Sequence, residues 1–262
     1  MISALYVSKT GLAAQDKQLS TISNNLANTS TVGFKRDSAI FEDLLYQVQR
    51  QPGASETQNS QLPTGLQIGT GSRVVATEKQ FTQGNLQVTE QPLDVAINGR
   101  GFLQVLQPDG TIAYTRNGQL QLNSTGQIVN SDGLVIDPAI TVPQGTSKIV
   151  IGTDGSVNAY TTASPATPQQ LGNITLADFV NPAGLQAIGG NLFVQTVSSG
   201  TPQQGAPNEN GMGSLLQGQL ESSNVDIVEE MVNMITTQRA YEMNSKVVST
   251  ADKMLQDIAQ NL

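Results

Sequence analysis

The chain has 262 residues and a formal net charge of −8, and only 37% of its residues are apolar. A nucleic-acid-binding protein normally presents a basic face, so this acidic balance argues against a nucleic-acid partner. Because the sequence contains no Cys and no His, it excludes thiol catalysis, disulfides, Cys-ligated metals and catalytic triads that need an imidazole.

Residues 1–36 are predicted to form a helix followed by a polar junction. Leucines recur every seven residues, which is typical of a coiled-coil-like seam. Asn, Thr and Ser compete for their own backbone groups, so we expect the helix to end between Asn28 and Ser30. The residues expected to pack against other subunits are Leu5, Leu12, Leu19, Ile22 and Leu26.

The start of the chain shows no signal for secretion or membrane insertion. It has neither a basic first segment nor a continuous apolar run, which predicts that no signal peptide is cleaved. No stretch approaches the roughly 20 apolar residues of a membrane span. We therefore expect no direct insertion into a membrane.

Residues 37–80 are expected to form an extended arm. The segment is rich in Gln and contains Pro and several Gly, a composition typical of extended chain or loop. An arm of this length without its own core needs a neighbouring subunit to become ordered, and a flexible linker is the alternative. The residues expected to anchor the arm or limit its slack are Phe41, Leu44, Leu45, Tyr46, Pro52 and Pro63.

Residues 81–215 are predicted to form an antiparallel, all-β domain. Short runs with alternating apolar residues are separated by turn pairs such as Asn98-Gly99, Asp109-Gly110 and Asp132-Gly133. Asp-Gly pairs are ordinary hairpin turns, and the dense alternating acids of a calcium loop are missing. Partial glycine motifs at Gly69 and Gly211 do not lie between a strand and a helix. We therefore expect neither a metal nor a nucleotide cofactor.

Residues 216–262 are predicted to form a second long helix. Apolar residues recur every seven positions, and neither Pro nor Gly interrupts the sequence after Glu221. The first segment is net positive and the last is net negative, so the two helices would attract each other. We expect an α+β chain whose terminal helices pair as a coiled-coil-like inner domain. Its further packing residues are predicted to be Ile227, Met231, Met234, Tyr241, Val248, Leu255 and Leu262.

The stretch "NLANTSTVGFKR" resembles the N-terminal signature of the bacterial flagellar rod and hook family. Two stretches of the predicted β domain, "QGNLQVTEQPLDVAINGRGFLQV" and "YTRNGQLQLNSTGQIVNSDG", resemble the family's β domain, and the C-terminal helix resembles its closing helix. The resemblance covers essentially the whole chain. The long arm resembles that of distal-rod members, and the chain has no room for the extra domain of a hook protein. The signature residues are Asn25, Leu26, Ala27, Asn28, Thr31, Gly33, Phe34 and Lys35.

This resemblance implies a structural subunit of the distal rod and no enzyme activity. The terminal helices would form a stiff hollow tube around an export channel, and the β domain would turn inside the envelope rings while torque passes from motor to hook. The chain would lie in the basal body of the flagellum, spanning the periplasm to the outer membrane. Its partners would be further copies, proximal rod proteins, the hook protein, the rod cap, the periplasmic and outer-membrane ring proteins and the flagellar export apparatus.

Within the signature, the resemblance implies a bend in which Asn side chains bond to nearby backbone, with Phe34 anchoring the start of the arm. Ordinary helix termination is the alternative for each Asn. Other functions also stay open. A proximal rod protein would usually lack the long arm, and a hook-type protein would be longer, with an extra outer domain. A secreted fibre or adhesin would need a signal peptide, and a hydrolase would need two carboxylates facing each other across a cleft.

Overall fold

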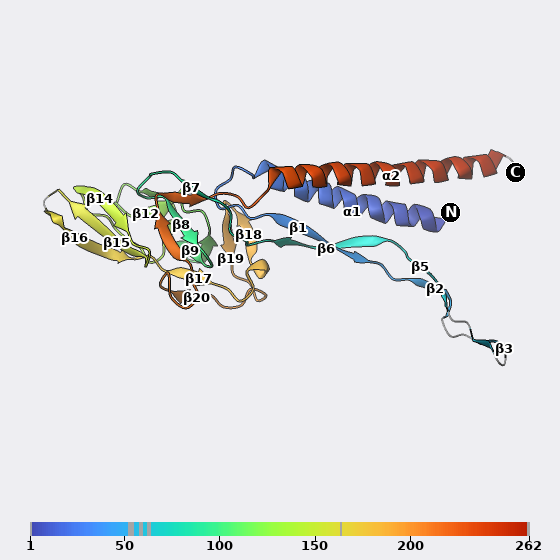
Figure 1. The fold of residues 1–262 in the computed structure, drawn as a ribbon, viewed down its shortest axis with the longest axis horizontal. Helices are drawn as coiled ribbons and strands as arrows, with labels where there is room; N and C mark the ends of the chain where they lie inside the picture. The colour runs from blue at the N-terminus through green and yellow to red at the C-terminus, as the bar shows by residue number, and fades with distance from the viewer. Residues whose placement is uncertain (1, 52–54, 58–59, 62–63, 163, 261–262) are drawn as a thin grey trace. The chain divides into compact units, whose positions relative to one another are not determined.

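The computed structural model describes residues 2–51, 55–57, 60–61, 64–162 and 164–260 (Figure 1). These residues divide into two compact units, unit 1 and unit 2. The chain starts in unit 1 and passes twice into unit 2 and back. The predicted domain boundaries at residues 36, 80 and 215 stay predictions. Unit 1 comprises Met1–Ala27, Asp37–Glu78 and Asp226–Leu262, and unit 2 comprises Asn28–Arg36 and Lys79–Val225.

Unit 1 contains two long helices, α1 (Ile2–Ala27) and α2 (Ile227–Gln260), which run antiparallel and pack against each other (Figure 1). Asp226 caps α2, because its Oδ1 atom accepts hydrogen bonds from the backbone N–H groups of Val228 and Glu229 at 2.8 and 3.1 Å. An acidic cap satisfies free donors and complements the helix dipole. Helical ends and a β-rich centre confirm the predicted α+β class, while the coiled-coil pairing stays a prediction.

The contact between the two helices includes many small and polar side chains. Gly11 lies so close to α2 that a methyl group at this position would be 3.1 Å from Nδ2 of Asn244. The most deeply buried positions of α2 are not those of its seven-residue apolar repeat. Buried residues are Ser8, Ala14, Ile22 and Asn25 on α1 and Glu230, Thr237 and Ala251 on α2.

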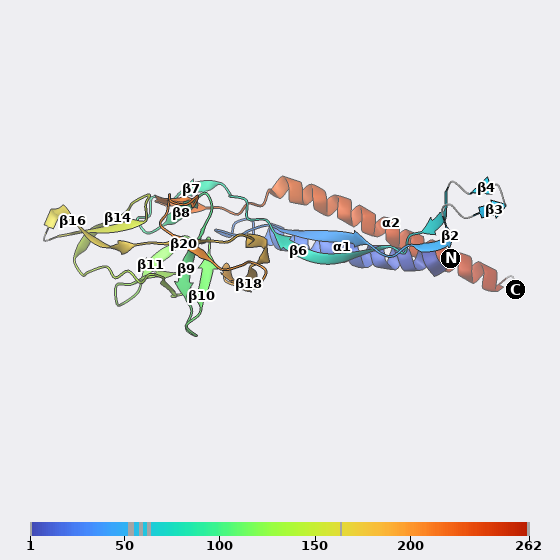
Figure 2. The ribbon, with the colours of Figure 1, turned by 90° about the horizontal axis from the view of Figure 1, so that it is seen from below.

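The arm of unit 1 is a two-stranded ribbon rather than a single extended chain (Figure 2). Hydrogen bonds join its two sides between the strand pairs, from Leu44 N–H to Gly71 O at 2.9 Å and from Thr70 Oγ1 to Leu45 O at 2.7 Å. Pro52 and Pro63 lie outside the described residues. The paired strands are β1 (Asp37–Asp43) with β6 (Ser72–Lys79), β2 (Gln47–Arg50) with β5 (Leu66–Ile68), and β3 (Ser55–Thr57) with β4 (Ser60–Gln61).

Unit 2 is built around a nine-stranded sheet in the order β11-β12-β13-β9-β10-β19-β18, to which β17 is added through β9 and β20 through β17. Asp109-Gly110 connects β9 to β10 and Asp132-Gly133 connects β12 to β13, as the hairpin prediction requires. The strands are β9 (Phe102–Leu106), β10 (Ile112–Thr115), β11 (Leu120–Leu122), β12 (Ile128–Asn130), β13 (Val135–Ile136), β17 (Leu176–Asp178), β18 (Gln186–Gly189), β19 (Leu192–Val194) and β20 (Gln203–Gly205).

Smaller sheets complete unit 2. A three-stranded antiparallel sheet has the order β14-β15-β16, and two strand pairs join β8 to β21 and β7 to β22. In the last two pairs, strands that directly precede the C-terminal helix in the sequence are paired with strands from the start of the β-rich region. The bounds are β7 (Leu86–Val88), β8 (Val95–Asn98), β14 (Thr146–Ile151), β15 (Ser156–Thr161), β16 (Ser164–Asn173), β21 (Ser214–Gln217), β22 (Gln219–Glu221) and a short 3-10 helix η1 (Pro182–Gly184).

Two apolar cores fill unit 2, one aliphatic and one aromatic. Side chains of a strand alternate between its faces, so along β9 Leu103 and Val105 enter the aliphatic core while Phe102 enters the aromatic one. Rings in the aromatic core meet edge to face with centroids 4.8 to 6.2 Å apart, a geometry that favours aromatic pairs. Its rings are Phe81, Phe102, Tyr114, Phe179 and Phe193.

Candidate functional site

The first signature residue, Asn25, joins the end of α1 to the start of β1 within unit 1. Its Nδ2 donates to the carbonyl oxygen of Asp37 at 2.8 Å, and its Oδ1 accepts from the N–H of the same residue at 2.9 Å. An amide that bonds to both backbone groups of one residue imitates a neighbouring β-strand. Further along, Asn28 Oδ1 accepts from Thr31 Oγ1 at 3.1 Å. Side-chain amides therefore do bond to nearby groups at this junction.

Gly33 occupies a position in unit 2 that a larger residue would strain. Its φ angle is +70°, and an added Cβ would lie 2.8 Å from the backbone carbon of Arg116. Its N–H donates to the carbonyl oxygen of Glu221 at 2.8 Å. A left-handed φ and a close backbone neighbour both require glycine here.

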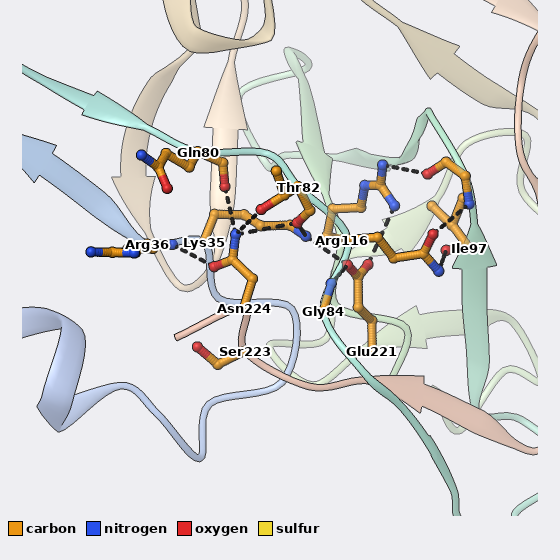
Figure 3. A network of polar contacts seen from close by, with 12 residues as sticks. Lys35, Arg36, Gln80, Thr82, Gly84, Ile97, Arg116, Glu221, Ser223 and Asn224 are labelled. Atoms are coloured by element: carbon orange, nitrogen blue, oxygen red, sulfur yellow. Dashed lines mark hydrogen bonds and ion pairs between the residues drawn. The ribbon is translucent and has the colours of Figure 1, made fainter. Parts of the chain in front are cut away.

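Lys35 and Glu221 form an ion pair in the interior of unit 2 (Figure 3). Lys35 Nζ lies 2.6 Å from Oε1 of Glu221, and 0% of either side chain is exposed. The ammonium also donates to Thr82 O at 2.7 Å, and the carboxylate accepts from Gly84 N–H at 2.9 Å. Burial lowers the pKa of Lys35, because loss of hydration outweighs the attraction of Glu221. Removing either charge would leave the other buried without its partner.

Arg116 is a second buried cation on the same carboxylate. Its Nη1 lies 3.3 Å from Oε2 of Glu221, and its Nη2 donates to the carbonyl oxygen of Gly99 at 2.8 Å. The guanidinium carbon lies 5.3 Å from the centroid of Phe102, within range of a cation–π interaction. Burial lowers the pKa of Arg116, although a guanidinium stays charged in proteins. One carboxylate thus holds two cations in the interior.

Asn224 connects two further stretches of unit 2 (Figure 3). Its Oδ1 accepts from Arg36 N–H at 2.7 Å, while its Nδ2 donates to Gln80 O at 2.8 Å and to Thr82 Oγ1 at 2.9 Å. Residues 33–36, 80–84 and 221–224 are therefore held together, although they are far apart in the sequence. We call this arrangement of Lys35, Arg116, Glu221 and Asn224 the buried clasp.

Phe34, the predicted anchor of the arm, is buried in unit 2. Lys79 Nζ lies 5.2 Å from the centroid of its ring. This distance is within the range of a cation–π interaction. The ring is thus fixed within the unit, and its role as the anchor of the arm stays a prediction.

The predicted packing residues differ in burial, and most of them are half-buried or exposed. On α1, Ile22 is buried and the heptad leucines are half-buried. On α2, Met234 and Val248 are half-buried, and Leu262 lies outside the described residues. The exposed members are Ile227, Met231, Tyr241 and Leu255. Val228, Val232 and Ile235, which widen the apolar stripe at the start of α2, are exposed as well. Exposed apolar residues of α2 that the sequence pattern did not indicate are Met243, Val247 and Met254.

The arm also carries exposed apolar side chains. Of the predicted anchors, Phe41, Leu45 and Tyr46 are exposed and Leu44 is half-buried. Val48, Leu66 and Val75 of the ribbon are exposed as well. A two-stranded ribbon is only one layer, and although its base contacts α1, these apolar side chains stay exposed within the chain.

The acidic residues and one surface pocket bear on the hydrolase alternative. The described residues contain no group of three or more acidic residues placed to hold a metal ion. A pocket of about 530 Å³ is lined by residues 92–93, 122–126 and 142–149, and none of these is Asp or Glu. The paired carboxylates that a hydrolase needs are therefore missing from this pocket. Neither α1 nor α2 has an apolar stretch long enough to cross a membrane.

The sequence did not single out three members of the buried clasp, namely Arg116, Glu221 and Asn224, as site residues. A cation and an acid in strand-forming sequence look like ordinary solvent-facing residues. Arg116 and Asn224 lie inside stretches that resemble the family, whereas Glu221 precedes the C-terminal stretch. Only folding brings them to Lys35.

Models of flagellar families match three parts of this chain. The model described as flagella basal body rod protein matches residues 5–35, and the flagellar hook protein FlgE/F/G D1 domain matches residues 96–159. The flagellar basal body rod FlgEFG protein C-terminal model matches residues 216–261. These ranges contain all four residues of the buried clasp, and the predicted family resemblance is confirmed.

Similar proteins cover nearly the whole chain. The chain is 51% identical over 260 residues to the flagellar basal-body rod protein FlgG of Buchnera aphidicola subsp. Schizaphis graminum, covering 99% of this chain and 100% of that protein. It is 47% identical to FlgG of Caulobacter vibrioides, covering 98% of each chain. It is 34% identical to FlgG of Bacillus subtilis, again covering 98% of each.

Proposed function

We propose, from the finding that this chain belongs to the flagellar basal-body rod protein family, that it is a structural subunit of the distal rod. In this proposal, copies of the chain assemble into a stiff hollow tube that transmits torque from the motor to the hook. The chain has no catalytic role and acts through its surfaces. The observation that carries the proposal is the apolar surface that unit 1 leaves exposed.

The first part of this surface lies at the start of α2. Five large apolar side chains occur within nine residues, and each is about half exposed or more. A monomeric soluble protein rarely exposes so much contiguous apolar surface, and such patches mark interaction sites. We name it the α2 patch. Its residues are Ile227, Val228, Met231, Val232 and Ile235.

A second copy of the same chain is the partner we propose for the α2 patch. Contact between two different surfaces of identical subunits generates a helical polymer when the rotation between subunits does not close into a ring. The charged ends of the chain favour such contacts, since the net positive first segment and the net negative last segment can attract each other between subunits. Repetition of this contact would build the tube.

The arm supplies the second part of the exposed surface. Leu45 is 89% exposed, and Tyr46, Val48 and Leu66 are at least half exposed. We propose that the ribbon lies along a neighbouring subunit, which buries these side chains and resists sliding between adjacent rows of subunits. The ribbon thereby makes the rod stiff.

The remaining partners follow from the family. We propose that the rod contacts proximal rod proteins at one end and the hook protein at the other, and that the rod cap guides its assembly. Unit 2 would form the outer layer that turns inside the periplasmic and outer-membrane rings. The chain would reach the basal body through the flagellar export apparatus.

A charged substitution in the α2 patch tests the proposal. We expect Val232→Asp to prevent polymer formation, because a carboxylate would be buried without a partner in every subunit contact. Gln238→Asp, at an exposed polar position of the same helix, is the matched control and should leave assembly intact. The measurements are sedimentation of purified protein and electron microscopy of basal bodies from cells that carry each variant. Normal rods from Val232→Asp would overturn the proposed role of the patch.

A further inference from the structure

We propose that Asn25 and Glu230 fix the register in which α1 and α2 pack. A register is the alignment of one helix along the other, and a change of one helical turn displaces it by about 5.4 Å. The inference concerns the fold of a single chain and does not depend on the proposed function. It assigns to the signature Asn a positioning role that its sequence context does not reveal.

Both residues are polar and lie in the interior of the helix pair. Each is only 1% exposed, and Nδ2 of Asn25 donates to Oε1 of Glu230 at 3.4 Å. The same amide is held from both sides by the backbone of Asp37. It therefore cannot turn to follow Glu230 if α2 slides along α1.

A second contact belongs to the same alignment. Gly11 of α1 faces Asn244 of α2. Gly11 precedes Asn25 by 14 residues, and Asn244 follows Glu230 by 14 residues, as an antiparallel pair requires. This separation is about four helical turns, so both contacts lie on the same side of each helix.

Apart from Ile22, the other buried positions of the interface offer little steric resistance to sliding. Buried positions near these contacts carry small side chains, such as Ser8 and Ala14 on α1 and Thr237 and Ala251 on α2. Small side chains form shallow ridges, which interlock weakly. Helices packed through such surfaces can shift by a whole turn when nothing specific opposes the shift.

The polar pair makes the neighbouring registers unfavourable. A slip of one turn in one direction would place the Glu230 carboxylate opposite Ile22, which is buried and apolar. A slip in the other direction would place Asn25 opposite Met234. In each case the hydrogen bond between the buried side chains of Asn25 and Glu230 would break, and the loss of a hydrogen bond between buried polar groups disfavours the slipped register. Polar groups inside helix pairs are known to select register in this way.

Disulfide trapping can measure the register directly, because the chain contains no Cys of its own. The pair Gly11→Cys/Asn244→Cys reports the native register. The pairs Gly11→Cys/Ala240→Cys and Gly11→Cys/Val248→Cys report slips of about one turn in either direction. The full-length purified chain is oxidised at low concentration, and the yield of intramolecular disulfide is measured by mass spectrometry for each pair.

In the otherwise unchanged chain we expect the Gly11→Cys/Asn244→Cys pair, which reports the native register, to give the highest yield of disulfide. Adding Asn25→Leu and Glu230→Leu should lower the native yield several-fold and raise at least one slipped yield. Glu230→Gln keeps a hydrogen-bond acceptor of the same length and should preserve the native pattern. The matched control is Ser8→Ala with Thr237→Val, which removes two buried hydroxyl groups from the same interface and should change nothing.

Two results would overturn the inference. One is an unchanged disulfide pattern in the Leu variant, and the other is an equal redistribution in the control. If the Leu variant loses its helical circular dichroism, Asn25→Ala replaces it, because this substitution removes the amide without adding bulk. A native pattern in Asn25→Ala would then contradict the role of the pair, and a redistributed pattern would support it.

Discussion

Unit 2 and unit 1 differ in how much of their apolar surface they bury. Unit 2 collects many of its apolar side chains in two cores, where Leu103 and Val105 are 0% exposed, although Val180 and Val197 stay exposed. Unit 1 leaves Val228 at 72% and Leu45 at 89%. Burial of apolar surface drives folding, while a large exposed apolar surface marks an interaction site. Unit 2 therefore buries apolar surface within the chain, whereas the exposed apolar surface of unit 1 is available for the subunit contacts proposed above.

Their ion pairs show the same contrast. Lys35–Glu221 in unit 2 and Arg73–Glu42 in unit 1 have similar lengths of 2.6 and 2.8 Å. The first pair is completely buried, whereas the side chains of the second are 62% and 52% exposed. Loss of one partner leaves an unpaired charge in the interior in the first case and only a hydrated side chain in the second.

The largest expected effect on folding comes from breaking the buried pair. Glu221→Gln leaves Lys35 and Arg116 buried without a counter-charge, so we expect the free energy of unfolding of unit 2 to fall by about 3–5 kcal/mol. The control Glu42→Gln on the arm should cost less than about 1 kcal/mol. Denaturant unfolding followed by circular dichroism measures both. Equal losses of stability in the two variants would show that burial does not increase the contribution of an ion pair to the free energy of unfolding.

A smaller loss is expected from Gly33→Ala. Alanine at a left-handed φ costs about 1–3 kcal/mol, and here its Cβ would also collide with the backbone beside Arg116. Gly133→Ala is a matched control, because Gly133 has a φ of +80° and open space around it. The difference between the two melting temperatures isolates the collision. A loss for Gly133→Ala as large as that for Gly33→Ala would contradict the proposed tight contact.

The buried Lys35 should also make the free energy of unfolding depend on pH, and we expect this effect to be smaller than those of the two substitutions above. The pKa of Lys35 in the folded state lies below the ordinary 10.5. At a pH between the folded-state pKa and 10.5, the unfolded chain therefore binds more protons than the folded chain. Stability of the unaltered protein relative to Lys35→Met should therefore rise as the pH increases toward 10.5. Denaturant unfolding at several alkaline pH values measures the difference. A difference that falls over this range would contradict the lowered pKa.

The smallest effect on folding is expected from the tip of the arm. Deletion of residues 51–63 should leave the stability of unit 2 unchanged, because no residue of that unit is removed. If the arm stiffens the polymer, the same deletion should give bent rods, and electron microscopy measures their curvature. Straight rods would make the tip a passive linker. Missing rods would show that the tip serves assembly instead.

The sequence by itself determined the classes of structure and their order along the chain. Seven-residue repeats predicted the two terminal helices, and Asp-Gly pairs predicted hairpins such as that between β9 and β10. These features depend on residues close together in the chain, where side-chain periodicity and turn chemistry act directly. Resemblance of the signature around Asn25 and Gly33 added the family.

Only the tertiary structure decided which polar residues are buried and what they contact. Nothing near Glu221 in the sequence marks it as the partner of Lys35, and nothing near Glu230 marks it as the partner of Asn25. Likewise, the repeat on α2 did not separate half-buried Met234 from exposed Tyr241, although both are members of it. Burial depends on contacts between segments far apart in the chain, and the cost of leaving a buried polar group unpaired then selects its partner.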